Sequence, residues 1–216
     1  MAGELDSICS ALGLAPTPGQ LQALLGYLDL LQRWNATYNL TAVRDRGAMR
    51  VQHLADCLSV VPAVSRLLPA GRLLDVGSGG GLPGVVLAIM LPSLEVSCVD
   101  AVGKKAAFVQ QVAGTLALPN LRALRARVES LQSAPFDLIT SRAFSSRGDF
   151  TRLSGHLLAP AGCWMAMKGK QPGAEIASLP PEIHMFHVEP LTVPGLDAER
   201  CLVWIRPQQF STDNKA

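Results

Sequence analysis

The chain has 216 residues, of which 49% are hydrophobic and 17% are charged, and its net charge is +2 at pH 7. This length and apolar content suit one domain with a sizeable buried core, or one domain with an extension. The small net charge does not by itself indicate a nucleic-acid binder, although clustered basic residues would permit one. The first six residues lack the apolar segment of a secretory signal, and no apolar run reaches membrane-spanning length. We therefore expect a soluble cytoplasmic protein without membrane segments.

The spacing of cysteines and histidines argues against disulfides and metal sites. The five cysteines are scattered and odd in number, and no two form a C-x-x-C pair, which fits small buried hydrophobic residues in a reducing compartment. His53 and Asp56 are three residues apart on a predicted helix and so share a face, but the other histidines show no matching spacing. We predict that the protein binds no metal.

Residues 1–70 are predicted to form a helical extension. Thr17-Pro18-Gly19-Gln20 is typical of a capped helix start, with Thr at the N-cap, Pro first in the helix and Gln three residues after the cap. Leucines then recur at helical spacing from residue 21 to residue 31. A second amphipathic stretch runs from residue 51 to residue 61 and is expected to stop at Pro62. These helices are too small, and too apolar on one face, to stand alone, so we expect them to pack on the rest of the chain.

From Arg72 the pattern changes to strands that alternate with helices. Five strands are predicted at residues 73–76, 94–100, 121–124, 136–140 and 163–167, with helices at 83–90, 104–115 and near 149–158. Two further strand-like segments, about 183–193 and 201–205, come next without a helix between them. Alternating units predict a parallel sheet, and the closing pair predicts an antiparallel edge hairpin. The predicted fold class is therefore α/β, with a mostly parallel seven-stranded sheet in a domain of residues 71–207 and a frayed tail at residues 208–216.

A glycine-rich turn between the first strand and its helix is the most informative segment. Residues 79–84 match the dinucleotide-binding pattern G-x-G-x-x-G, whereas residues 75–81 give an acid followed by G-x-G-x-G. The carboxylate of Asp75 would repel a pyrophosphate but suits a ligand that carries an ammonium group. We favour the second pattern. A tight strand–helix turn without a ligand is the third possibility.

Ligands of such sheets bind beyond the carboxyl ends of the strands, beside the first strand. Candidate site residues stand at that edge after each of the five alternating strands. They are Gly77 to Gly81 after the first strand, Asp100 at the end of the second, Arg127, Val128 and Glu129 after the third, Ser141, Arg142 and Phe144 after the fourth, and Lys168, Gly169 and Lys170 after the fifth. We expect these residues to line one site.

Two carboxylates in this set have alternative interpretations. Asp100 can accept both hydroxyls of a ribose, as in NAD and S-adenosylmethionine sites, or it can cap the helix of residues 104–115. Glu129 can accept the exocyclic amine of an adenine beside the backbone of Val128, or it is an exposed charge paired with Arg125 or Arg127. The sequence leaves both questions open.

Basic residues gather around the same edge. Six arginines lie between residues 122 and 152, against three acids, and four lysines at positions 104, 105, 168 and 170 adjoin them. Such a surface attracts a phosphate backbone, although surface charge without a partner is the alternative. Arg142 stands out because it directly follows the apolar end of a strand.

Several segments between about residue 35 and residue 205 follow a familiar order. They are Asn39-Leu40-Thr41-Ala42, His53-Leu54-Ala55-Asp56-Cys57-Leu58, Asp75 to Gly84, Arg127-Val128-Glu129, Ser141-Arg142-Ala143-Phe144, Lys168-Gly169-Lys170 and Glu199-Arg200, with residues 100–105 as a looser match. In this order they resemble the bacterial glucose-inhibited division protein B (GidB) family of methyltransferases. Cys57 stands where the family usually has Ser, and Gly80 often varies to Pro.

The resemblance implies an S-adenosylmethionine-dependent, class I, Rossmann-like methyltransferase. Its implied reaction is methylation of N7 of one guanine in 16S ribosomal RNA, in the 530-loop region of the small ribosomal subunit. The implied cofactor contacts are Gly77, Leu82, Val128, Glu129 and Arg142, together with Gly79 and Gly81 of the turn and Asp100 on the ribose side. Lys168 and Arg200 are implied to face RNA. We add the hypotheses that Arg142 aligns N7, as the catalytic residue, and that Phe144 stacks on the base.

Guanine N7 carries a lone pair in the ring plane and no proton, so its methylation needs no general base. This fits a sequence without an obvious acid–base pair. Three alternatives stay open: a small NAD(P)-dependent oxidoreductase, a non-catalytic nucleotide-sensing module, and a non-catalytic rRNA-binding or ribosome-assembly factor. We expect a monomer whose partner is 16S rRNA or the small ribosomal subunit.

Overall fold

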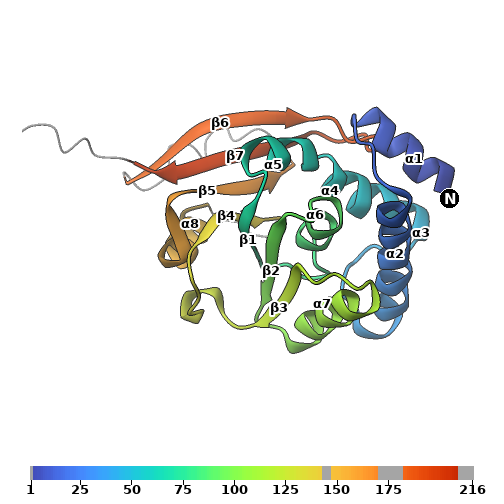
Figure 1. Ribbon diagram of the computed structural model, residues 1–216, viewed down its shortest axis with the longest axis horizontal. Coiled ribbons are helices and arrows are strands. Elements are labelled where there is room, and N and C mark those ends of the chain that lie inside the picture. Colours follow the sequence, from blue (N-terminus) through green and yellow to red (C-terminus); the bar gives the residue numbers. More distant parts are fainter. Residues whose placement is uncertain (1, 143–146, 170–181, 209–216) are drawn as a thin grey trace, which may run out of the picture.

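Seven strands form one sheet in the order β3-β2-β1-β4-β5-β7-β6 (Figure 1). The computed structural model describes residues 2–142, 147–169 and 182–208. The strands are β1 (Gly71–Val76), β2 (Leu94–Asp100), β3 (Leu121–Arg125), β4 (Phe136–Ser141), β5 (Leu158–Lys168), β6 (Ile183–Leu191) and β7 (Arg200–Pro207). The first five strands run parallel, whereas β7 runs antiparallel to both β5 and β6. The predicted mostly parallel sheet with an antiparallel C-terminal edge is thus confirmed.

Alternate side chains of the central strands point to opposite faces of the sheet, and each face has its own core. Leu73 of β1 and its neighbour Leu138 of β4 are buried in the core of one face, while Leu74 is buried in the core of the other face with Trp164 of β5. A strand covered on both faces can be apolar throughout, which explains why these segments lack an alternating polar pattern.

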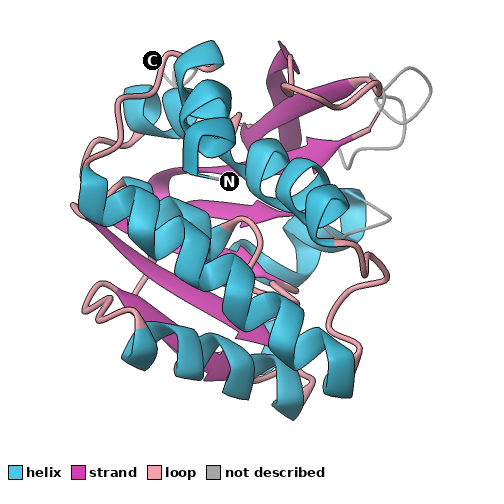
Figure 2. Cartoon of the chain, turned by 90° about the vertical axis from the view of Figure 1, so that its right-hand side faces the viewer, coloured by secondary structure: helices cyan, strands magenta, loops and turns pink. Residues whose placement is uncertain are grey.

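Helices cover both faces of the sheet. α6 (Gly84–Met90) and α7 (Gly103–Thr115) pack on the Leu73 face, and α8 (Arg147–Ser154) packs on the Leu74 face. Figure 2 shows helices lying across the sheet. The 3-10 turns η2 (Val128–Ser130) and η3 (Gly155–Leu157) complete this region.

The boundary between the last helix and the fifth strand differs from the prediction. α8 ends at Ser154, and β5 already begins at Leu158 rather than at residue 163. A register shift between Phe136 and Leu138 interrupts the pairing of β4 with β5 opposite Pro160 and Gly162. Such a bulge interrupts the hydrogen bonding between strands, so a strand can contain Pro160, which has no N–H group to donate, and Gly162.

The N-terminal helices are α1 (Ala2–Ala11), α2 (Pro18–Tyr38), α3 (Arg46–Met49), the π-helical segment η1 (Arg50–Ala55), α4 (Asp56–Leu58) and α5 (Val61–Leu67). The predicted cap of α2 is confirmed: Gln20 N donates to Thr17 Oγ1 at 3.2 Å, and Thr17 N donates to Gln20 Oε1 at 2.9 Å. The Gln20 side chain also donates to the carbonyls of Ile89 and Met90, at 3.0 and 3.1 Å. Gln20 therefore caps α2 and also satisfies carbonyls at the end of α6.

The predicted helix stop at Pro62 is wrong. The helical stretch ends earlier, at Leu58, and Pro62 lies in the first turn of α5. Proline is well placed there because the first turn has no intrahelical partner for the missing N–H group. Pro62 therefore belongs to a helix start.

The N-terminal helices and the sheet share one core. Leu24, Leu28 and Leu54 are buried in the same cluster as Leu73 and Val85. The helices between residues 2 and 67 therefore pack on the sheet region, and the division into an extension of residues 1–70 and a domain of residues 71–207 stays a prediction. Within the described residues, no helix combines the length and the apolar character needed to cross a membrane.

Candidate active site

The glycine-rich turn forms a loop, residues 77–81, between β1 and α6. Gly77 N and Ser78 N donate to the carbonyl of Val99 in β2, at 2.9 and 3.2 Å. Gly77, Gly79 and Gly81 have φ angles of 67°, 59° and 81°. This left-handed region favours glycine, and at Gly81 a Cβ atom would also collide with the Val85 side chain. The G-x-G-x-G pattern is therefore required by the shape of the loop.

Asp75 lies beneath this loop and does not face a ligand. Its side chain is fully buried, and one carboxylate oxygen accepts a hydrogen bond from Gly84 N at 2.9 Å. The other oxygen is buried without a hydrogen-bond partner in the part of the chain that the structure describes. Burial raises the pKa of Asp75 to about 7. The expectation that this carboxylate offers itself to a ligand's ammonium group is wrong, because the side chain turns to the start of α6.

Asp100, at the end of β2, ties three segments together. One of its carboxylate oxygens accepts from Gly79 N at 3.1 Å and lies 3.5 Å from Lys105 Nζ, and the other accepts from Val102 N at 2.9 Å. Val102 is the N-cap residue of α7, so the capping alternative holds in part. The same carboxylate also lines a cavity, so its ribose role stays a prediction.

That cavity, here the β2–β3 cavity, has a volume of about 280 Å³. Its walls are mostly apolar, with carboxylates at two places; it is lined by Val76, Gly77, Val99, Asp100, Ala101, Ala126, Arg127, Val128, Glu129 and Leu153. Glu129 pairs with Arg127 at 3.7 Å, and both side chains are exposed, so this ion pair is weak. Asp100, Val128 and Glu129 line the same cavity, as the sequence predicted.

A second cavity, the loop cavity of about 190 Å³, lies over the glycine loop. The N-terminal helices and the segment after α2 supply part of its wall; it is lined by Leu31, Leu40, Thr41, Gly77, Ser78, Gly79, Gly80, Leu82, Lys105 and Arg142. Beneath it the buried hydroxyl of Tyr27 donates to the carbonyl of Gly80 at 2.6 Å. Sequence reasoning missed Tyr27 and Leu31, because a helical leucine stripe gives no sign of which residues reach a distant loop.

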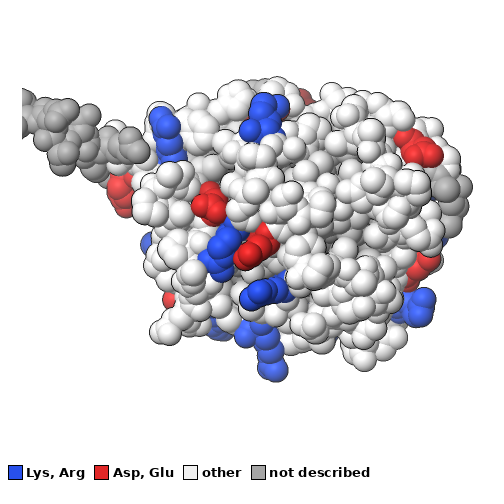
Figure 3. Space-filling view, in the orientation of Figure 1, with Lys and Arg blue, Asp and Glu red and all other residues white. Residues whose placement is uncertain are grey.

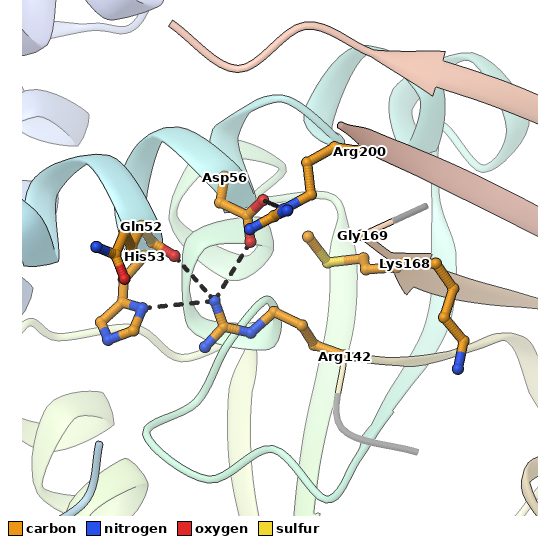
Figure 4. Close-up of a pocket in the computed structure, with 8 residues that line it drawn as sticks. Gln52, His53, Asp56, Arg142, Lys168, Gly169 and Arg200 are labelled. Carbon is orange, nitrogen blue, oxygen red and sulfur yellow. Dashed lines mark hydrogen bonds and ion pairs between the residues drawn. The ribbon is translucent and has the colours of Figure 1, made fainter. Parts of the chain in front are cut away.

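A third cavity, the basic cavity of about 310 Å³, gathers charged side chains from four segments. It is lined by Gln52, His53, Asp56, Arg142, Met167, Lys168, Gly169 and Arg200. Figure 4 shows Asp56 between the guanidinium groups of Arg142 and Arg200. Arg200 Nε donates to one carboxylate oxygen at 2.9 Å, and Arg142 Nη1 lies 3.4 Å from the other. His53 and Asp56 both line this cavity, as expected for two residues that share a helix face.

His53 links the basic cavity to the loop cavity. Its Nδ1 lies 3.5 Å from Arg142 Nη1, and its Nε2 lies 2.8 Å from Thr41 Oγ1. A guanidinium group only donates, so Nδ1 accepts and the protonated Nε2 donates to Thr41. Burial, followed by the charge of Arg142, lowers the pKa of His53 and keeps the ring neutral.

The three cavities are neighbours that share lining residues. Gly77 lines the β2–β3 cavity and the loop cavity, and Arg142 lines the loop cavity and the basic cavity. Arg142, Lys168 and Arg200 meet in the basic cavity, as expected for candidates at one edge of the sheet. Gly81 lines none of these three cavities, and Phe144 and Lys170 lie outside the described residues.

The arginines between residues 122 and 152 do not act as one unpaired basic surface. Arg127 pairs with Glu129, Arg142 with Asp56 and Arg152 with Asp149, the last pair at 2.7 Å. On the face drawn in Figure 3, charges of both signs lie close together. In the third cavity three basic side chains, Arg142, Lys168 and Arg200, lie with one acid, Asp56.

The fold is that of the class I, Rossmann-like methyltransferases. The structure is similar to a SAM-dependent methyltransferase from Aquifex aeolicus, with a TM-score of 0.54, 14% identity, and coverage of 77% of this chain and 96% of that chain. It is also similar to TrmN from Thermus thermophilus, with a TM-score of 0.54, 22% identity, and coverage of 70% of this chain and 49% of that chain.

Sequence comparison gives the family. Residues 20–203 match the GidB family, described as rRNA small subunit methyltransferase G. The ribosomal RNA small subunit methyltransferase G of Acidovorax sp. (strain JS42) is 56% identical over 208 residues, which cover 92% of each chain. The protein of the same name from Leptothrix cholodnii is 55% identical over 204 residues, which cover 94% of each chain. The chain belongs to the GidB family, and the family resemblance seen in its motifs is confirmed.

Proposed function

We propose that this protein transfers a methyl group from S-adenosylmethionine to N7 of a guanine in 16S ribosomal RNA, within the 530-loop region. The observation that carries this proposal is the position of Arg142, which lines both the loop cavity and the basic cavity. A side chain there can touch the methyl donor and the RNA together. The names of the relatives support small-subunit ribosomal RNA as the substrate.

The β2–β3 cavity and the loop cavity suit the two ends of the cofactor. The first has apolar walls for an adenine, beside Val128 and Glu129. Asp100 receives hydrogen bonds from two backbone N–H groups, and a carboxylate offers about four acceptor sites, so it retains capacity for ribose hydroxyls. The loop cavity lies against the glycine backbone, where an amino-acid group fits. When bound, the cofactor supplies a methyl group on a positively charged sulfur.

The reaction asks the protein to position its reactants, since N7 has no proton to remove. Arg142 can donate to the guanine O6 beside N7 and so turn the N7 lone pair toward the loop cavity. Correct positioning supplies on the order of 7–11 kcal/mol of rate enhancement. His53 stays neutral and acts as a hydrogen-bonding support for Arg142.

The RNA approaches from the side of the basic cavity. Lys168 and Arg200 line it and attract phosphate groups, while Phe144 remains our candidate for stacking on the base. N7 faces the deep groove of an RNA helix, so the target guanine is a loop nucleotide or is splayed out. We expect the protein to act as a monomer in the cytoplasm.

The decisive experiment is transfer of a tritiated methyl group to deproteinised 16S RNA and to small ribosomal subunits, with nucleoside analysis of the product. We expect the label in 7-methylguanosine. Label in another nucleoside would contradict the assignment to N7. A protein that binds S-adenosylhomocysteine but labels no RNA would be a sensing module. One that binds 16S RNA and ignores S-adenosylhomocysteine would be a non-catalytic assembly factor.

A further inference from the structure

Asp56 is the acid at the centre of a cavity that the proposed function assigns to RNA. It is only 3% exposed and belongs to the N-terminal helices, whereas its two partners come from the sheet. Arg142 follows β4 and Arg200 begins β7, and these strands are separated by β5 in the sheet. In the described part of the sheet, β4 and β7 therefore do not pair directly with each other. Asp56 links the two guanidinium groups (Figure 4).

The contacts with Asp56 use only part of each arginine's guanidinium group. Arg200 reaches Asp56 through Nε, and its Nη1 donates to the carbonyl of Glu199 at 2.9 Å, so these two contacts leave Nη2 unused. Arg142 contacts Gln52, His53 and Asp56 through Nη1. Both arginine side chains remain about a quarter exposed, at 28% and 25%. A carboxylate with one cation on each oxygen therefore orients two donor groups without enclosing them.

We propose that Asp56 is a positioning residue that holds Arg142 and Arg200 in the geometry that receives the target nucleotide. This inference rests on the proposed function. Arg142 lies beside the loop cavity and meets the base, and Arg200 lies on the far side of Asp56 and meets a phosphate of the same or an adjacent nucleotide. Asp56 itself touches neither methyl donor nor RNA.

The substitution Asp56→Asn separates positioning from simple electrostatics, because the two predict opposite signs. Removing an acid makes the cavity more positive, which by charge alone strengthens RNA binding and lowers KM for RNA. If Asp56 positions the arginines, kcat for methyl transfer falls at least tenfold and KM for RNA does not improve. A purely structural role lowers the melting temperature and leaves kcat per folded molecule unchanged.

The assay measures kcat and KM for small-subunit RNA, with S-adenosylhomocysteine affinity as a separate readout that we expect to change less than twofold. Glu189→Gln is the matched control, because Glu189 also pairs with an arginine, Arg66, at 3.1 Å, on β6 outside the three cavities. Unchanged kcat in Asp56→Asn, or a lower KM at full kcat, would overturn the inference. Wild-type protein without methyl transfer would instead refute the proposed function.

Arg200→Lys provides a second test if Asp56→Asn does not fold. Lysine keeps the charge and can pair with Asp56. Its single ammonium group, however, cannot contact Asp56 and also present the planar pair of N–H donors that a guanidinium group offers to a phosphate. We expect kcat/KM for RNA to fall at least fivefold with unchanged S-adenosylhomocysteine affinity. Wild-type kcat/KM in this variant would show that the held geometry of Arg200 is unimportant.

Discussion

Arg142 is the residue on which the proposed chemistry depends most. For Arg142→Ala we expect methyl transfer to fall about 100-fold, because a reactant that loses its aligning contact is misplaced by an ångström or more. The substitution also leaves Asp56 with Arg200 as its remaining basic partner, so some loss of stability is expected. Methyl transfer measured on protein of verified fold tests this prediction. A rate equal to that of the wild type would remove Arg142 from the mechanism.

Asp75 makes stability depend on pH in a direction that can be worked out. Its pKa is about 7 in the folded chain, above the ordinary value of 3.8, so between these values the folded state holds a proton that the unfolded state releases. The stabilising contribution of the protonated group is complete below pH 3.8 and is lost as pH rises through 7. Asp75→Asn, which keeps an oxygen for Gly84 N, should therefore gain stability relative to wild type between about pH 5 and pH 8.

Urea unfolding of wild type and Asp75→Asn at about pH 5 and about pH 8 measures this difference in the free energy of unfolding. Glu95→Gln is a suitable control, because Glu95 lies exposed on the neighbouring strand β2. An equal difference between wild type and Asp75→Asn at the lower and the higher pH would show that the Asp75 carboxyl group titrates alike in both states.

At the scale of elements, helix α2 supports the cofactor site from outside the sheet. Tyr27→Phe removes the hydroxyl that donates to Gly80 and leaves the buried ring in place. One such hydrogen bond contributes about 1 kcal/mol, so we expect S-adenosylhomocysteine to bind about fivefold more weakly to a less ordered loop. Calorimetry measures this change. Tyr38→Phe, at the exposed end of the same helix, should bind normally, and equal affinity in both variants would contradict the role of Tyr27.

The elements also show where sequence reasoning succeeds. Local signals predicted the cap at Thr17, the glycine loop and the core strands, because each depends on residues close together in the chain. The helix stop predicted at Pro62 was wrong, because proline is common both after the end of a helix and in its first turn. The π-helical segment η1 was not predicted, because one extra residue in a helical turn leaves no distinct pattern.

At the scale of the whole molecule, the group of three neighbouring cavities follows from the order of the strands. The rule that ligands bind beyond the carboxyl ends of parallel strands correctly gathered Gly77, Asp100, Glu129 and Arg142. It did not predict that Asp75 is buried beneath the loop, since that depends on the close approach of Gly84. The wall made by Leu31 and Thr41 also depends on how distant helices pack.

Because one guanidinium group borders both the loop cavity and the basic cavity, we expect the affinities of the two ligands to be coupled. Whatever factor RNA applies to the dissociation constant of S-adenosylhomocysteine, the latter must apply to that of RNA, by the reciprocity of linked equilibria. Titrations in both orders should give the same factor, different from one, and Arg142→Ala should bring it close to one. A factor of one in the wild type would mean that each ligand binds without sensing the other.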